Sequence, residues 1–244
     1  MSGPENTGSG RPLVITDCDE VLLHMVAPFR QWLTEEQGID FDMAGGDFGR
    51  SMHYGVGGAE VPHEEIWRLL NLFFDDQMHR QMPITGAIEA MHALSEHADV
   101  VVLTNLLDHR QATRTAQLAG HGLDVRVFTN QGPKGPALQA ILDEYRPTTA
   151  VFIDDLAQHH DSVASTAPHV HRLHLCGEPG LSGHIACAFE AGHADARIDT
   201  WEHALPWLMD RISRPATSPT TATSPITAAS PTTATPPIPA EETR

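Results

Sequence analysis

The sequence predicts an α/β fold in which a doubly wound, mostly parallel sheet carries a small, mainly helical second domain. Two observations lead to this fold class. Short runs of β-branched and other apolar residues alternate with helical patterns over most of the chain. Several of these runs end in acidic or polar side chains, which is how buried parallel strands deliver such groups to the carboxyl edge of a sheet.

The first predicted strand ends in a pair of carboxylates. An apolar run that starts at Leu13 leads into Asp17-Cys18-Asp19. Side chains two residues apart on an extended backbone share a face, so Asp17 and Asp19 can reach one site. Two such acids repel each other unless a cation lies between them or one keeps its proton. A strand that simply runs into a polar turn would show the same pattern, so the pair needs partners elsewhere in the chain.

A mainly helical insertion, residues 22–82, is predicted after this strand. Helices are expected at 28–37, ending at Gly38, and at 63–80, where apolar residues recur at helical spacing. The glycine-rich stretch 44–58 follows no strand and lacks a Gly-Lys-Ser/Thr ending, so we interpret it as a mobile loop and expect no strand in the insertion. Three residues of this loop are candidates for contact with a substrate: Arg50, His53 and Tyr54.

Strand and helix alternate after residue 83. Strands are expected at 100–103, 125–128, 149–153 and 170–175, with helices between them, and an amphipathic helix is expected at 201–212. Such alternation is typical of parallel strands joined by helical crossovers.

Polar groups follow two of these strands and open one of the helices. Thr104 and Asn105 end one strand, Asp154 and Asp155 end another, and Lys134 begins a helix among glycines and prolines. Each has a plain structural alternative. Thr104 could cap a helix, the Asp pair could cap the helix that follows it, and Lys134 could be solvated.

The chain is strongly acidic, with 15 basic and 32 acidic residues and a net charge of −17. This balance argues against nucleic acid or an anionic membrane as the main partner, and a phosphate substrate would need a local positive centre. No apolar run approaches the ~20 residues of a membrane span and no secretory pattern opens the sequence, so we expect a cytoplasmic protein. Residues 1–11 and 214–244 are expected to be disordered because they are rich in small residues and proline.

Taken in order, the motifs resemble those of the haloacid dehalogenase-like (HAD) hydrolase superfamily. They are an apolar-Asp-x-Asp-x-Val run at 14–21, an apolar-Thr run at 100–104, the helix-opening lysine at 134, and an apolar-Asp-Asp run at 151–155. The resemblance covers about residues 12–175. It implies a Rossmann-like core of residues 12–21 and 83–213, with residues 22–82 as a helical cap between the first and second motifs.

The resemblance implies a phosphatase that works through an aspartyl-phosphate. Asp17 matches the nucleophile that attacks phosphorus. Asp19 matches the general acid that protonates the leaving oxygen and then deprotonates the hydrolytic water. Mg²⁺ is the implied cofactor, and its implied ligands are Asp17, the backbone carbonyl of Asp19, Asp155, and Asp154 through water or from behind the others.

The remaining motif residues are implied to hold the phosphate. Thr104 and Asn105 would bind its oxygens, and Lys134 would neutralise charge on Asp17 and on the transferring group. The expected substrate is a small phosphorylated metabolite. A phosphomutase, a hydrolytic dehalogenase or a catalytically idle binding or regulatory protein remain alternatives on the same scaffold. The intact acids argue against the last two, since dehalogenation needs neither a metal nor a second acid and an idle protein has no reason to keep repelling carboxylates.

One residue departs from the superfamily pattern. Many members have glycine directly after the second aspartate, where Glu20 stands here. We expect the local turn to differ and the Glu20 side chain to face water, although a carboxylate at the entrance could instead select against highly charged substrates. The sixteen histidines match no zinc pattern; the run from His169 to His174 is expected on an exposed edge, and His159 is expected to line the active site.

Overall fold

The structure is a computed structural model that describes residues 10–42 and 48–213. Most of the two segments expected to be disordered lie outside the described residues, as do residues 43–47, which include the start of the predicted mobile loop. Arg11 is bound to the core, since its guanidinium donates to the carbonyl of Ser95 at 3.1 Å. Within the described ranges, no helix is long and apolar enough to cross a membrane.

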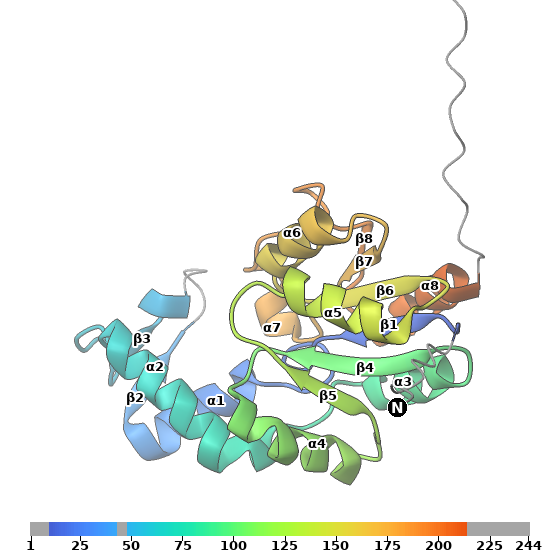
Figure 1. Ribbon diagram of the computed structural model, residues 1–244. Coiled ribbons are helices and arrows are strands. Elements are labelled where there is room, and N and C mark those ends of the chain that lie inside the picture. Colours follow the sequence, from blue (N-terminus) through green and yellow to red (C-terminus); the bar gives the residue numbers. More distant parts are fainter. Residues whose placement is uncertain (1–9, 43–47, 214–244) are drawn as a thin grey trace, which may run out of the picture.

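Six parallel strands form the central sheet, in the order β5-β4-β1-β6-β7-β8 (Figure 1). Their bounds are β1 Leu13–Thr16, β4 Asp99–Thr104, β5 Arg126–Thr129, β6 Ala150–Asp154, β7 His171–His174 and β8 Ala196–Arg197. The chain builds outward from β1 to β4 and β5, and then crosses over to β6 on the other side of β1. Doubly wound sheets bind ligands at such a switch point, beyond the carboxyl ends of the strands. The predicted parallel sheet is confirmed, and the short β8 was not predicted.

Helices cover both faces of this sheet. They are α3 Ala87–Ser95, α4 Gln111–Gly120, α5 Gly135–Tyr145, α6 Ala157–Thr166 and α8 Trp201–Ser213. The short α7 Pro179–Ser182 instead packs Leu181 against the apolar core of the inserted segment. Because alternate residues of a strand point to opposite faces, Val14 of β1 packs in one apolar cluster with α3 and α8. Leu13 and Ile15 pack in a second cluster with α5 and α6. Burial on both faces explains why the strands are continuous apolar runs in the sequence.

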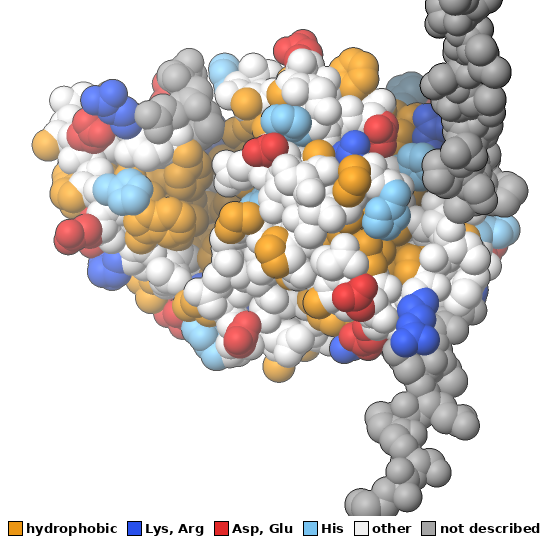
Figure 2. All heavy atoms as spheres, turned by 45° about the horizontal axis from the view of Figure 1, so that its top comes forward, with side chains coloured by type: hydrophobic (Ala, Val, Ile, Leu, Met, Phe, Trp, Pro, Cys, Tyr) orange, Lys and Arg blue, Asp and Glu red, His pale blue; other side chains and the backbone are white. Residues whose placement is uncertain are grey.

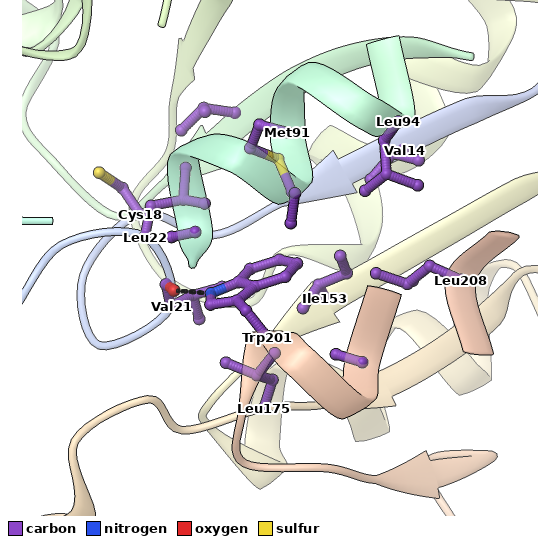
Figure 3. Packing of buried hydrophobic residues seen from close by; sticks show 14 of the residues in the cluster. Val14, Cys18, Val21, Leu22, Met91, Leu94, Ile153, Leu175, Trp201 and Leu208 are labelled. Atoms are coloured by element: carbon purple, nitrogen blue, oxygen red, sulfur yellow. Dashed lines mark hydrogen bonds between the residues drawn. The ribbon is translucent and has the colours of Figure 1, made fainter. Parts of the chain in front are cut away.

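Trp201 ties the last helix to the segment that follows the acidic pair. Its side chain is almost fully buried and lies beside Ile153 and Leu208 in the first cluster (Figure 3). Its indole N–H donates a 2.8 Å hydrogen bond to the carbonyl of Val21 (Figure 3). Truncating a buried aromatic side chain of this size to alanine costs about 3–5 kcal/mol. α8 therefore helps to hold the chain in place just beyond the acidic pair.

The inserted segment, residues 22–82, forms a smaller body beside the sheet (Figure 1). Its helices are α1 Val26–Trp32, continued by a π-helical turn Leu33–Gln37, and α2 His63–Leu72, continued by Phe73–Gln77 and Met78–Arg80. Gly38 ends the first helix with a φ of 65°, a left-handed conformation that glycine adopts without strain. The segment has its own apolar core, in which the rings of Phe29 and Phe73 meet edge to face at 5.3 Å.

The inserted segment also contains two strands, contrary to the prediction. β2 (Ile39–Phe41) and β3 (Met52–Tyr54) pair antiparallel, and Phe41 lies opposite Met52. Both of these side chains are buried in the apolar core of the segment. Each strand has three residues, which is too short for an alternating pattern to be recognised in the sequence.

The histidine run was expected on an exposed edge of the sheet, but it lies inside the sheet. β7 is bonded to β6 on one side and to β8 on the other. His174 is fully buried, and its Nδ1 accepts a 2.9 Å hydrogen bond from the N–H of Ala188. Burial lowers the pKa of His174 to about 4, so its ring is neutral at pH 7. The unexpected strand β8 is what covers this edge.

Candidate active site

Three carboxylates meet where β1 and β6 end. Asp17 follows β1, and its N–H continues the ladder by donating to the carbonyl of Ile153 at 2.8 Å. Asp154 is the last residue of β6, and Asp155 follows it. Oxygens of Asp17, Asp154 and Asp155 lie within 4.8 Å of one another. The parallel register of β1 with β6 is what brings them together, because it aligns the carboxyl ends of the two strands.

Lys134 supplies the positive charge of this cluster. It lies at the N-terminus of α5, and its side chain is fully buried. Its Nζ lies 2.8 Å from Asp17 Oδ1 and donates to Asp154 Oδ2 at 2.7 Å. Burial alone would lower the pKa of Lys134, but the charges of Asp154 and Asp17 outweigh burial and raise the pKa. Lys134 is therefore a charged group inside the cluster and not a solvated lysine at a helix start.

The lysine does not balance all three acids. Burial raises the pKa of Asp17, against the attraction of Lys134. Burial, together with the charges of Asp154 and Asp17, raises the pKa of Asp155 well above its usual range. No hydrogen bond joins the Asp155 carboxylate to another residue of the described ranges, although the side chain is buried. A buried carboxylate left without a partner beside two others fits a site for a hard divalent cation such as Mg²⁺, which prefers oxygen ligands.

Asp154 differs from the other two acids because both of its oxygens are engaged. Oδ2 accepts from Lys134, and Oδ1 accepts from the N–H of Leu156 at 2.9 Å. It therefore orients Lys134 and the loop after β6, and is less free than Asp17 or Asp155 to bind a cation directly.

Thr104 and Asn105 end β4 at the same edge of the sheet. The Thr104 hydroxyl is buried and has no hydrogen-bond partner among the described residues. The Asn105 side chain donates to the carbonyl of Gly132 at 3.0 Å, and its Nδ2 lies 3.3 Å from Nε2 of His159. Burial lowers the pKa of His159, which favours a neutral ring. Since a buried hydroxyl costs free energy when it is unpaired, Thr104 has a hydrogen bond available for a ligand.

Asp19 is held by two residues that the sequence analysis did not find. Arg114 is fully buried, and its Nη2 donates to both carboxylate oxygens of Asp19, at 2.9 and 3.1 Å. Gln81 Nε2 donates to Asp19 Oδ1 at 2.7 Å. Burial alone would lower the pKa of Arg114, but the charge of Asp19 outweighs burial and raises the pKa. The sequence held one signal for Arg114: it lies four residues before Leu118, on the face of α4 that is buried.

Glu20 is buried, which corrects the expectation that it faces water. It adopts a φ of 59°, the left-handed conformation for which many superfamily members use glycine. Its Oε1 accepts hydrogen bonds from the N–H groups of Met25, at 2.8 Å, and Val26, at 2.5 Å. Burial raises the pKa of Glu20 to about 7. The side chain thus caps the start of α1, which stabilises the turn from the core into the inserted segment.

Comparisons with known proteins identify the fold. No family model matches the sequence, and no curated protein matches it. A HAD family hydrolase from Deinococcus radiodurans R1, solved with bound phosphate and sodium, is 17% identical, and the match covers 83% of this chain and 97% of that one with a TM-score of 0.59. The chain has the haloacid dehalogenase-like fold. The resemblance predicted from the motifs is confirmed at this level.

Other solved structures show the same HAD-like fold. The HAD-hydrolase YfnB from Bacillus subtilis, bound to magnesium, is 14% identical, and the match covers 82% of this chain and 99% of that one with a TM-score of 0.55. A protein from Thermotoga maritima described as a beta-phosphoglucomutase is 15% identical, with 82% and 99% coverage and a TM-score of 0.52. The fold is therefore shared by proteins described with different reactions.

A cavity of about 530 Å³ opens above the carboxylates of this HAD-like core. Asp17, Asp19 and Asp155 lie at its base, and His159 lines it, as the sequence analysis expected. Hydrophobic side chains gather where the inserted segment faces the core (Figure 2). The apolar lining residues are Met25, Val26, Phe48, Leu70, Phe74, Leu156, Ala157, Leu181, Ile185 and Ala186, together with the half-exposed Trp67. These residues come from separate parts of the chain, so no local motif marked them in the sequence.

The structure does not bring Arg50, His53 and Tyr54 to this cavity. Arg50 Nε lies 3.8 Å from an oxygen of Glu60, and Tyr54 is half exposed. His53 lies in the β2–β3 ladder. The stretch was expected to be a mobile loop, but the pairing of β3 with β2 holds His53 and Tyr54 in a strand, and Arg50 lies in the 3-10 turn Phe48–Arg50 before it. Phe48, from the same glycine-rich stretch, does line the cavity.

Proposed function

We propose that this protein is a divalent-metal-dependent phosphatase that removes phosphate from a small phosphorylated metabolite through an aspartyl-phosphate on Asp17. The observation that carries the proposal is the buried group of three carboxylates around Lys134, at the carboxyl ends of β1 and β6. Such a group is costly to a fold and suits phosphoryl transfer, in which catalysis is largely positioning and charge stabilisation.

In the proposed reaction, a carboxylate oxygen of Asp17 attacks phosphorus in line with the ester oxygen. The O–P bond to Asp17 forms while the ester O–P bond breaks, and the leaving alcohol oxygen takes up a proton. Lys134, 2.8 Å from Asp17, orients the nucleophile and offsets charge on the transferring group. The unpaired hydroxyl of Thr104 and the amide of Asn105 supply donors for phosphate oxygens at the end of β4.

Asp19 is the proposed proton carrier. Its carboxylate lines the cavity, and the contacts with Arg114 and Gln81 fix its position. It would protonate the leaving oxygen and then accept a proton from the water that attacks the aspartyl-phosphate, which returns Asp17 to its carboxylate form. Two carboxylates in different surroundings, one beside Lys134 and one beside Arg114, are suited to these two roles.

Mg²⁺ is the proposed cofactor. The residues that would hold it are Asp17 and Asp155 through their carboxylates and Asp19 through its backbone carbonyl, with Asp154 positioning Lys134 behind them. A divalent cation bound there would neutralise charge on the transferring phosphoryl group. Two proteins of the same fold are described with bound cations, one with sodium and phosphate and one with magnesium, which supports a cation as cofactor.

The rival functions explain less of the site. A dehalogenase would have no use for the partnerless buried carboxylate of Asp155 or for the braced Asp19. An idle protein would keep three buried repelling acids without benefit. A phosphomutase uses the same residues and differs in whether water reaches the intermediate. The acidic chain, with net charge −17, supports a small-molecule substrate over nucleic acid or an anionic membrane.

The test is hydrolysis of p-nitrophenyl phosphate by wild type and Asp17→Asn, each with Mg²⁺ and with EDTA. Turnover by wild type that needs Mg²⁺ and is lost in the near-isosteric variant would support the proposal. The folding of both proteins is checked by far-UV circular dichroism. Turnover by Asp17→Asn at the wild-type rate would refute the assignment of the nucleophile.

A further inference from the structure

The cavity above Asp17 points to the chemical class of the leaving group. We propose that the substrate is a phosphate monoester whose leaving group is apolar and uncharged, of the aryl or medium-chain alkyl type. The inference rests on the proposed function and adds to it the kind of alcohol that is released.

The walls of the cavity are predominantly apolar. Residues from α1, from α2 and from the end of the core contribute to them, including Val26, Leu70, Phe74, Leu181 and Ile185. Trp67 stands at the rim with 55% of its surface exposed, an unusual position for so large an apolar side chain. A leaving group that covers these surfaces would gain about 25 cal/mol for each Å² of apolar area removed from water.

Lysine and arginine are absent from the described walls. No lysine or arginine of residues 10–42 or 48–213 lines the cavity, and residues 43–47 contain neither. Four acids, Asp17, Asp19, Glu20 and Asp155, line the cavity, and the buried Lys134 is paired with Asp17 and Asp154. A second phosphate or a carboxylate on the leaving group would therefore meet negative charge without a counter-charge, which costs binding free energy.

Arg110 does not change this conclusion. It lines an adjoining cavity that shares Trp67 and Phe74 with the first. Its Nε, however, donates to Asp75 at 2.6 Å, and its Nη2 donates to the side-chain oxygen of Asn71 at 3.0 Å. The guanidinium is thus already paired by α2 residues and the turn after them, and has little charge left to offer an anionic substrate.

The size and polar content of the cavity set the scale of the leaving group. A volume of about 530 Å³ lies in the range of cavities that enclose small organic ligands. Besides the acids Asp17, Asp19 and Asp155, the polar side chains that line it are Glu20, Asn105, Gln158, His159 and His184. Sugar hydroxyls that faced the apolar walls would be left unpaired, which costs binding free energy.

The experiment compares phosphate esters that differ only in apolar length. Propyl, pentyl and octyl phosphate have alcohols of nearly equal basicity, so differences in kcat/KM report binding of the chain in the transition state. We expect kcat/KM to rise about threefold to fourfold for each added methylene until the cavity is filled. Pentyl phosphate should exceed 1,5-pentanediol bisphosphate by at least about tenfold, because the second phosphate would lie among apolar walls whose described residues include no lysine or arginine.

A matched pair of variants places the effect in this cavity. Trp67→Ala should lower kcat/KM for octyl phosphate by about tenfold or more and leave propyl phosphate nearly unchanged. Phe189→Ala removes an aromatic side chain of similar exposure, 53%, that does not line the cavity, and should change neither substrate. Trp67 is half exposed, so its removal is not expected to unfold the protein.

Two outcomes would overturn the inference while leaving the phosphatase proposal intact: a flat kcat/KM across the alkyl series, or a preference for the bisphosphate. Equal losses from Trp67→Ala for propyl and octyl phosphate would also overturn it. If no ester is hydrolysed and fluoroberyllate with Mg²⁺ does not bind, the proposed function itself fails and this inference fails with it.

Discussion

Replacing Asp155 with asparagine should stabilise the protein and abolish its activity. The Asp155 carboxyl is only 5% exposed, and its oxygens lie within 4.8 Å of those of Asp17 and Asp154. Two unit charges at that separation repel by about 3–4 kcal/mol at an effective dielectric constant of about 20. Lys134 offsets part of this repulsion. We therefore expect Asp155→Asn to raise the free energy of unfolding by about 1–3 kcal/mol at pH 7.5 in the absence of divalent metal.

The pH dependence has a definite sign. Burial and neighbouring charges raise the pKa of Asp155 in the folded protein, so the folded state holds a proton that the unfolded chain releases at a lower pH. The stability that this group contributes is complete below its ordinary pKa of about 4 and is lost as the pH rises toward the raised value. The advantage of Asp155→Asn over wild type should therefore shrink as the pH falls from 7.5 toward 4.

Urea unfolding of wild type, Asp155→Asn and Asp124→Asn in EDTA measures this effect. Asp124 is an exposed carboxylate, so its substitution controls for the loss of one negative charge and should change stability by less than about 0.5 kcal/mol. Added Mg²⁺ at one hundred times its Kd should stabilise wild type and the control by about 2.7 kcal/mol, and Asp155→Asn by much less. The reasoning is refuted if Asp155→Asn is less stable than wild type in EDTA at pH 7.5.

Three further substitutions test separate features. Glu20→Gln should be more stable than wild type above pH 7 by up to about 3 kcal/mol in urea unfolding. Burial raises the pKa of Glu20 to about 7, so wild type loses stability as the pH rises from about 4.5 to that value. Equal stabilities of the two proteins at pH 8 would contradict this. Gly135→Ala should lower the free energy of unfolding by about 1–3 kcal/mol, because a Cβ at this position would lie 2.5 Å from the carbonyl oxygen of Ser162. Gly120→Ala is the control and should be neutral, because a Cβ there would have no atom within 4 Å. Arg114→Met should cost about 3–5 kcal/mol, because Asp19 would lose its charged partner and keep only the hydrogen bond from Gln81. The double variant with Asp19→Asn should recover most of the loss, and additive effects in that double-mutant cycle would contradict direct coupling.

The parts of the site that could be predicted are those that lie at the ends of recognisable elements. Asp17, Thr104 and Asp155 each follow an apolar run that reads as a buried strand, and parallel strands present their carboxyl ends at one edge. Lys134 was marked by its place at a helix start among glycines and prolines. For these residues, local pattern and parallel topology together were sufficient to bring the side chains to one place.

The remaining parts depend on contacts between distant segments. Arg114 meets Asp19 across 95 residues of sequence, and a single arginine in a helix is ordinarily a surface residue. Glu20 looked like an exposed substitution for glycine, yet it takes the left-handed turn and turns its carboxylate onto the start of α1. The strands β2 and β3 have three residues each, and their pairing across the glycine-rich stretch leaves no periodic signal.

The most direct test of the central claim is to trap the covalent intermediate. Wild-type protein is mixed with Mg²⁺ and excess p-nitrophenyl phosphate, treated at once with sodium borohydride, digested and analysed by mass spectrometry. Borohydride reduces an aspartyl-phosphate to homoserine, so the account predicts homoserine at position 17, dependent on Mg²⁺ and on substrate. Conversion at Asp19 or Asp155 instead, or turnover without conversion at any aspartate, would contradict Asp17 as the nucleophile.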